Sequence, residues 1–194
     1  MIRAFIAINL PPAVLARLAQ FEHELAAGFV AGAARWVRPE QIHLTLKFLG
    51  EVPEESLSDL EIALRRACQP SAPLELRADG LGCFPHPCDA RVLWVGILGD
   101  LDRLEELHAR VEEQTRTWSA RDAARPFQPH LTIARVKGLR LADRRRFGEK
   151  IAGHARVSLG GWRVDRVDLM QSVLSPHGAD YECLAAFALL GVEP

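Results

Sequence analysis

Two short stretches of the chain repeat the order histidine, aliphatic residue, threonine, aliphatic residue. They are His43-Leu44-Thr45-Leu46 and His130-Leu131-Thr132-Ile133, and they lie nearly half of the 194-residue chain apart. Each stretch has a strand-like pattern, and side chains alternate between the two faces of a strand, so the histidine and threonine of each stretch share one face. One such pair alone is typical of an ordinary structural strand. Two copies at this spacing predict two similar lobes that each contribute one pair to a shared cleft.

Two histidines and two threonines, without a carboxylate cluster or metal-ligand spacing, favour proton transfer at a phosphate. An unperturbed histidine titrates near pH 6.5, so one imidazole can accept a proton while another donates one. A base beside phosphorus takes a proton from water, and an acid on the opposite side protonates the departing oxygen. Threonine hydroxyls can donate hydrogen bonds to the phosphoryl oxygens as negative charge builds up on them. A serine hydrolase is disfavoured because no Gly-x-Ser-x-Gly motif occurs.

The composition is that of an ordinary globular protein. Apolar residues make up 48% and charged residues 25% of the chain, which argues against disorder and predicts a single domain over residues 1–194. The formal net charge of −1 argues against binding to duplex DNA or an anionic membrane through bulk charge, although a local basic cleft remains compatible with it.

The first residues and the cysteines indicate the compartment. The apolar run before Pro11 is too short for a signal peptide or a membrane span, so we expect a soluble cytoplasmic protein, and a monomer. The four cysteines are sparse and form no Cys-x-x-Cys pair, which favours reduced thiols. The segment from Cys83 to Cys88, which includes His86, lacks a recognised zinc spacing, so we expect no metal site and no cofactor.

Hydrophobic periodicity predicts a mixture of strands and helices in an α+β fold rather than a doubly wound parallel sheet. Helices are expected from Pro12 through Leu25, over 54–68, from Leu101 through Val111 with Asp100 as the cap, and over 141–152. Turns are expected at 50–53 and 175–178, with a loop at 82–90. Strands are expected over 2–8, 35–37, 42–49, 74–81, 91–98, 130–136, near 157, and over 162–174 and 181–190.

The two motifs and their surroundings resemble the 2H phosphoesterase superfamily, and within it the RNA 2′,3′-cyclic phosphodiesterases, historically called 2′-5′ RNA ligases. The resemblance implies a bilobal α+β fold in which two lobes related by a pseudo-twofold axis, rich in antiparallel strands, face a central cleft with helices outside. It also implies metal-independent opening of a 2′,3′-cyclic phosphate at an RNA end to a 2′-phosphate. Besides the motifs, the segments that carry the resemblance are 3–8, 35–37, 47–50, 82–85, 91–94, 125–127, 134–135 and 172–181.

The resemblance assigns roles to the four motif residues. His43 matches the proton donor to the leaving 3′-oxygen, and His130 matches the proton acceptor that activates water. Thr45 and Thr132 match the residues that hold the phosphoryl oxygens. The donor and acceptor labels would exchange in the reverse reaction, which is ligation.

Four further residues are expected to bind substrate. Arg135 matches a family arginine near the phosphate, where a planar guanidinium suits the anion, and Phe84 matches an aromatic residue that could stack on a base. Arg35 is a second candidate arginine. Lys47 lies four residues after His43 in a strand and should therefore share its face. A surface salt bridge, a core phenylalanine and an exposed strand lysine are the alternatives for Arg135, Phe84 and Lys47.

Other functions share the same motifs. The alternatives are a nucleotide- or RNA-binding module with little catalysis, 2′-5′ ligation of tRNA halves, and cleavage of a small cyclic nucleotide. The proline-rich segment between Cys83 and Cys88 departs from the family pattern at the lip of the expected cleft, which leaves substrate preference open.

Overall fold

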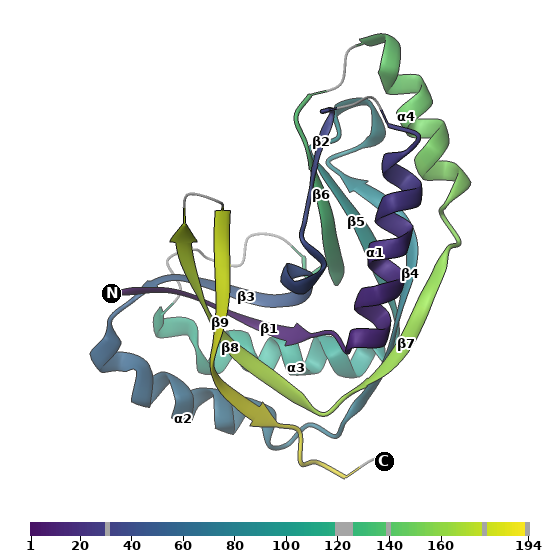
Figure 1. Cartoon of the computed structure of the whole chain (residues 1–194). Helices are drawn as coiled ribbons and strands as arrows, with labels where there is room; N and C mark the ends of the chain where they lie inside the picture. Colours follow the sequence, from purple (N-terminus) through teal and green to yellow (C-terminus); the bar gives the residue numbers. More distant parts are fainter. Residues whose placement is uncertain (30–31, 119–125, 139–140, 176–177, 193–194) are drawn as a thin grey trace.

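The computed structural model describes residues 1–29, 32–118, 126–138, 141–175 and 178–192. The chain alternates between strands and helices from its first residues (Figure 1). In chain order the elements are β1 (Ile2–Asn9), α1 (Pro12–Ala26), β2 (Ala34–Trp36), the 3₁₀ turn η1 (Pro39–Gln41), β3 (His43–Val52), α2 (Leu57–Cys68), β4 (Leu74–Phe84), β5 (Val92–Gly99), α3 (Leu101–Gln114), β6 (His130–Val136), α4 (Leu141–Gly153), β7 (Ser158–Val164), β8 (Arg166–Ser175) and β9 (Gly178–Ala188).

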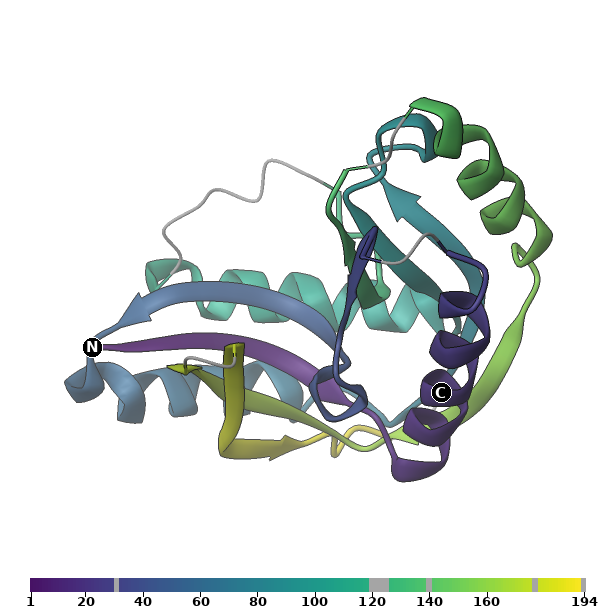
Figure 2. The ribbon, with the colours of Figure 1, turned by 45° about the horizontal axis from the view of Figure 1, so that its top comes forward.

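The strands form one curled antiparallel sheet made of two groups of four. The strand order is β7-β4-β5-β6-β3-β1-β8-β9, and β2 adds to the free side of β6. The seam between the groups is short, because β3 and β6 are registered only at Leu44 and Leu131. Figure 2 shows the two groups meeting at a steep angle with helices on their outer sides. The predicted α+β fold with two antiparallel lobes is confirmed.

Helices cross between the groups and join them into one core. Helix α1 leaves β1 and packs against β7 of the other group, whereas α3 leaves β5 and packs against β3 and α2. One continuous hydrophobic cluster therefore contains buried residues of both groups, including Ile6, Leu44, Leu93 and Leu131. Because helices from each strand group pack against the other group, separating the groups at the seam would expose apolar surface on both sides and is unfavourable.

Local sequence accounts for most element boundaries, and pairing accounts for the differences. Pro12 begins α1 and its stripe of Val14, Leu18 and Phe21 is buried, as predicted. Strand β3 continues through residues 50–52, where a turn was expected, because these residues pair with the start of β1. The expected strand 162–174 is two strands: β7 is the edge strand of one group, and β8 lies beside β9, the edge strand of the other group. The expected turn at 175–178 lies partly outside the described residues.

Asp100 stands at the N-terminus of α3, but its carboxylate does not cap the helix. It instead accepts hydrogen bonds from the backbone N–H of Glu75 at 2.9 Å and from Arg103 at 3.1 Å. The predicted capping role is thus replaced by a link between α3 and β4. None of the described helices combines the length and hydrophobicity needed to cross a membrane.

Candidate active site

A cavity of about 810 Å³ lies over the seam of the sheet and is lined by His43, Thr45, His130 and Thr132 together. The two histidines begin β3 and β6, the strands that meet at the seam. Leu44 and Leu131, which follow the histidines, are fully buried. Alternation along each strand therefore turns the histidine and threonine toward the cavity, and the expectation that both pairs share one cleft is met.

A β-bulge at Leu46 interrupts that alternation in β3. Ala7 pairs with Thr45, whereas Ile6 pairs with Lys47, so Leu46 is an extra residue in the strand. Lys47 consequently points to the core, where only 3% of its side chain is exposed and its Nζ lies 2.8 Å from the Glu112 carboxylate. The prediction that Lys47 shares the face of His43 is wrong, because the bulge reverses the faces beyond Thr45. The residue turned outward is Phe48, which lines the cavity.

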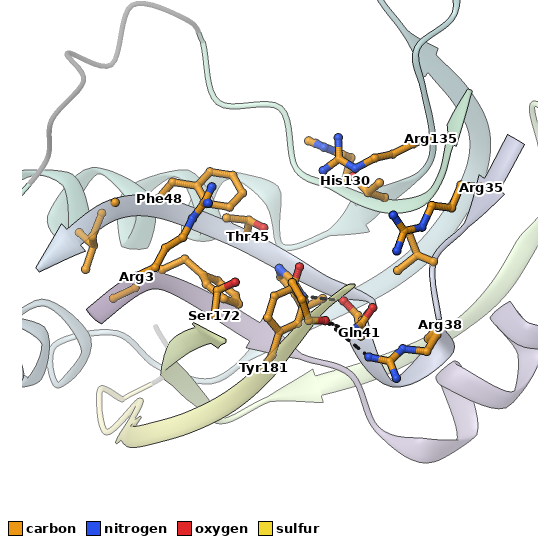
Figure 3. Close-up of a pocket in the computed structure, with 18 of the residues that line it drawn as sticks. Arg3, Arg35, Arg38, Gln41, Thr45, Phe48, His130, Arg135, Ser172 and Tyr181 are labelled. Carbon is orange, nitrogen blue, oxygen red and sulfur yellow. Dashed lines mark hydrogen bonds between the residues drawn. The ribbon is translucent and has the colours of Figure 1, made fainter. Parts of the chain in front are cut away.

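Strand β6 contains the corresponding bulge at Ile133. Trp94 pairs with Thr132, whereas Leu93 pairs with Ala134. Ala134 is therefore buried like Lys47, and Arg135 is turned outward like Phe48. Arg135 lines the cavity, as does Arg35, its direct partner on β2. The structure thus brings both predicted arginines to the cavity, as Figure 3 shows.

The His43 imidazole is held on three sides. Its Nδ1 lies 2.8 Å from the carbonyl oxygen of Gln41, and because a carbonyl only accepts, Nδ1 carries a hydrogen and Nε2 is left for the cavity. Phe5 stacks on the ring at 4.8 Å, and Tyr181 meets it edge-on at 5.3 Å. Burial lowers the pKa of His43, and the hydrogen bond to Gln41 opposes this effect only in part.

His130 is tied in the same way but has different neighbours. Its Nδ1 lies 2.7 Å from the carbonyl oxygen of Gln128, so Nε2 is again free to act. The ring edge of Phe84 packs against it at 5.0 Å, and Trp94 lies 6.3 Å away. Phe84 does not belong to the lining of the cavity. The structure therefore places Phe84 beside His130 as a packing neighbour, and its stacking on a base stays a prediction.

Several lining residues were missed by the sequence analysis. Gln41 donates through its side chain to the carbonyl oxygen of Ala179 in β9, and Arg38 pairs with Asp180. The sequence does hold a signal for Gln41, because Gln128 precedes His130 at the same distance and the repeat is therefore Gln-x-His-x-Thr. The other missed lining residues with polar or aromatic side chains are Arg3, Phe5, Trp36, Phe48, Ser172 and Tyr181.

The electrostatics of the cavity favour an anion. Arg3, Arg35, Arg38 and Arg135 line it, and among the described residues that line it none is acidic. Arg35 and Arg135 are like charges on directly paired strands, an arrangement that costs stability unless an anion lies near both. Within the described residues, no three His, Cys, Asp or Glu side chains are grouped as a metal site would need.

Comparisons with known proteins agree with this geometry. A family model described as the 2′-5′ RNA ligase superfamily matches residues 10–175. The chain is 31% identical over 188 residues to a protein of Methanothermobacter thermautotrophicus named RNA 2′,3′-cyclic phosphodiesterase, covering 97% of this chain and 99% of that one. It is 35% identical over 195 residues to a Thermus thermophilus protein of the same name, covering 97% of this chain and 91% of that one.

Solved structures show the same likeness. The crystal structure of E. coli LigT complexed with 3′-AMP matches with a TM-score of 0.75 and 25% identity, covering 97% of this chain and 98% of that chain. The crystal structure of a Thermus thermophilus protein matches with a TM-score of 0.75 and 32% identity, covering 98% of this chain and 100% of that chain. The similarity thus extends over the whole fold, well beyond the two repeated motifs.

Proposed function

Because the chain belongs to the 2′-5′ RNA ligase superfamily, we propose that it hydrolyses the 2′,3′-cyclic phosphate at an RNA end to a 2′-phosphate. The observation that carries the proposal is the pairing of two imidazoles in one arginine-lined cavity, each tied through Nδ1 and free at Nε2. Relatives named RNA 2′,3′-cyclic phosphodiesterase support the substrate class.

The two histidines divide the proton transfers. Nε2 of His130 takes a proton from water as the water oxygen bonds to phosphorus. The bond from phosphorus to the 3′-oxygen breaks, and Nε2 of His43 gives its proton to that oxygen. The products are a 2′-phosphomonoester and a 3′-hydroxyl, and proton exchange with solvent restores both rings. Each positioned proton transfer contributes about 10²- to 10⁴-fold to the rate.

The threonines and arginines stabilise the negative charge of the phosphate. Thr45 and Thr132 lie on the strands that carry the histidines, so their hydroxyls can donate to the non-bridging oxygens as negative charge grows. Arg135, with Arg35 beside it, offers a fork of donors for the phosphate.

For His43 to act as the proton donor, the negative charge of the substrate must help to protonate its imidazole. Burial lowers the pKa of His43, so the free enzyme holds this ring largely neutral at pH 7. An anionic phosphate within a few ångströms favours the imidazolium form and raises the pKa again. Binding of the cyclic phosphate therefore helps to protonate the acid that its own cleavage needs.

The test is to incubate the protein with a short RNA that ends in a 2′,3′-cyclic phosphate, with and without a chelator, and to analyse the end groups. We expect a 2′-phosphate in both reactions. A persistent cyclic end would contradict hydrolysis and leave a binding module, whereas a 3′-phosphate product would contradict the bond assigned above. Hydrolysis that stops when chelator is added would contradict a metal-independent reaction.

A further inference from the structure

His108 on α3 forms a flat stack with Phe127. The two ring centroids lie 4.0 Å apart, and the ring planes are 9° from parallel. Only 17% of the His108 side chain is exposed, and Phe127 packs against the main hydrophobic cluster. Close contact between two largely covered rings restricts both side chains. The position of Phe127 therefore depends on His108.

Phe127 lies next to the group that fixes His130. The following residue is Gln128, whose carbonyl oxygen lies 2.7 Å from Nδ1 of His130. That hydrogen bond selects the tautomer in which Nδ1 is protonated and Nε2 is free, which is the form that a proton acceptor needs. Residues 126–129 belong to no helix or strand. The Gln128 carbonyl is therefore held in place by side-chain contacts of its neighbours, among them the stack of Phe127 on His108.

His108 is also anchored to the first half of the cavity. Helix α3 packs on β3 (Figure 2), and the His108 ring hydrogen-bonds the backbone of Leu46, the extra residue of the β3 bulge. This bond raises the pKa of His108, so the ring donates and the Leu46 carbonyl accepts. A bulge leaves its extra residue out of the strand ladder. Helix α3 thus supplies a hydrogen-bond partner to a residue that the sheet leaves unpaired.

The charged groups around His108 come from α3 and β3. A Glu112 carboxylate oxygen lies 3.8 Å from Nε2 of His108, and the other lies 2.8 Å from the buried Lys47 Nζ. Glu112 and Glu105 raise the pKa of the ring, whereas Lys47 lowers it. Burial has the largest effect and lowers the pKa. The imidazole is therefore largely neutral at pH 7, and it stacks on Phe127 without a charge that Lys47 would repel.

We propose that His108 is a positioning residue that holds the proton acceptor His130 in its reactive tautomer by fixing Phe127. The inference rests on the proposed function and adds to it that α3 links the geometry of the second half of the cavity to the bulge in the first. His108 does not belong to the cavity lining. Its effect on the reaction passes through the carbonyl of Gln128.

Heteronuclear NMR of the labelled ring nitrogens, at about pH 8 where the rings are neutral, tests the proposal without substrate. In the wild-type protein His130 should show one protonated Nδ1 and one unprotonated Nε2. In His108→Ala these two signals should move toward each other as His130 samples both tautomers, whereas His43, tied to Gln41, should keep its signals. His108→Phe keeps a ring against Phe127 and should retain the wild-type signals of His130. His108→Gln keeps a donor but no ring, and it should shift them.

Steady-state kinetics provides the functional measurement. His108→Ala should lower kcat on an RNA 2′,3′-cyclic phosphate by about 10- to 10²-fold and change KM by less than about twofold, because a misplaced reacting group slows the chemical step rather than binding. Phe127→Ala should cause a similar loss. The double variant should lose no more than Phe127→Ala alone, since both changes act through one contact. The control is His23→Ala, which replaces an exposed histidine on α1 and should change neither quantity.

Wild-type His130 signals in a folded His108→Ala variant would overturn the proposal whatever its kcat, as would shifted signals with wild-type kcat. Equal shifts of the His43 and His130 signals would also overturn it, because they would indicate a general loosening of the seam. If the alanine variant does not fold, the other two variants decide, and His130 signals closer to wild type in His108→Gln than in His108→Phe would contradict the stack. Signals that shift as expected in a protein that hydrolyses no cyclic phosphate would support the positioning role and refute only the proposed reaction.

Discussion

The two halves of the cavity share one backbone design and differ in the side chains around it. Each half offers a histidine tied to the carbonyl of a glutamine two residues earlier, a threonine, and a bulge directly after the threonine. In the first half Phe5 stacks on the imidazole, and Gln41 is itself bonded to β9. In the second half the Nδ1 hydrogen bond is exposed and Phe84 touches the ring by its edge. Symmetric strands thus place the reacting groups, while unsymmetric packing surrounds the two imidazoles differently, and burial lowers the pKa of His43.

Replacing either histidine should have the largest effect, and it tests whether both halves of the cavity take part in acid–base catalysis. His43→Ala and His130→Ala should each lower kcat by at least about 10²-fold, because each removes one of two proton transfers. Both residues line a cavity rather than fill the core, so circular dichroism and thermal unfolding should stay close to wild type. Substantial turnover in one folded variant would mean that only the other half carries out acid–base chemistry.

We expect the two threonines to contribute equally to kcat, although the surroundings of the two histidines differ. Thr45→Ala and Thr132→Ala should each cost about 10- to 10³-fold in kcat, the usual effect of losing one transition-state hydrogen bond. Thr45→Ser and Thr132→Ser keep the hydroxyl and should recover most of the rate. Steady-state kinetics on a cyclic-phosphate substrate measures all four variants. If the kcat losses of the two alanine variants differed by more than about tenfold, the two threonines would not have equivalent roles.

The stacking of Phe5 can reveal which limb of the pH profile belongs to His43. Phe5→Leu opens the environment of the ring, so the desolvation that lowers the pKa of His43 weakens and that pKa rises. The kcat/KM profile follows the fraction of free enzyme in which the donor is protonated, so a higher pKa of His43 should move the alkaline limb to higher pH. Phe84→Leu makes the matched change beside His130 and should leave this limb in place. Movement of the acidic limb in Phe5→Leu would reverse the donor and acceptor assignments.

The smallest effect is expected at a buried carboxyl group on α1. Burial, with a contribution from Glu40 next to Gln41, raises the pKa of Glu22 to about 8. The folded protein then binds a proton that the unfolded chain releases near its ordinary pKa of 4.5, so stability falls as pH rises between these two values. Glu22→Gln removes the ionisation and should raise the free energy of unfolding at pH 8 by about 1–3 kcal/mol relative to wild type.

That advantage should shrink toward pH 5, where the wild-type carboxyl is protonated in the folded state. Urea unfolding at both pH values measures the difference. The control is Glu24→Gln on the same helix, where the side chain is exposed and accepts a hydrogen bond from Gln20, and it should change neither value appreciably. A Glu22→Gln effect that is the same at pH 5 and pH 8 would contradict an ionisation cost at this position.

The sequence by itself determined the reacting groups and the strands that hold them. Alternation is a local rule, so it correctly turned His43 and Thr45, and likewise His130 and Thr132, to one face of each strand. The repeat of the two motifs at half-chain spacing was enough to predict two lobes and a shared cleft. Even the glutamines that tie the imidazoles were present as a repeated position.

Only the tertiary structure decided what surrounds those groups. The bulges depend on how β3 pairs with β1 and how β6 pairs with β5, so a count along one strand put Lys47 in the cavity and missed Phe48. The pairing of Arg35 with Arg135, and the contacts of Phe5 and Tyr181 with His43, join residues far apart in the chain. Strand register and burial are set by such long-range contacts, and no periodicity within a short window contains them.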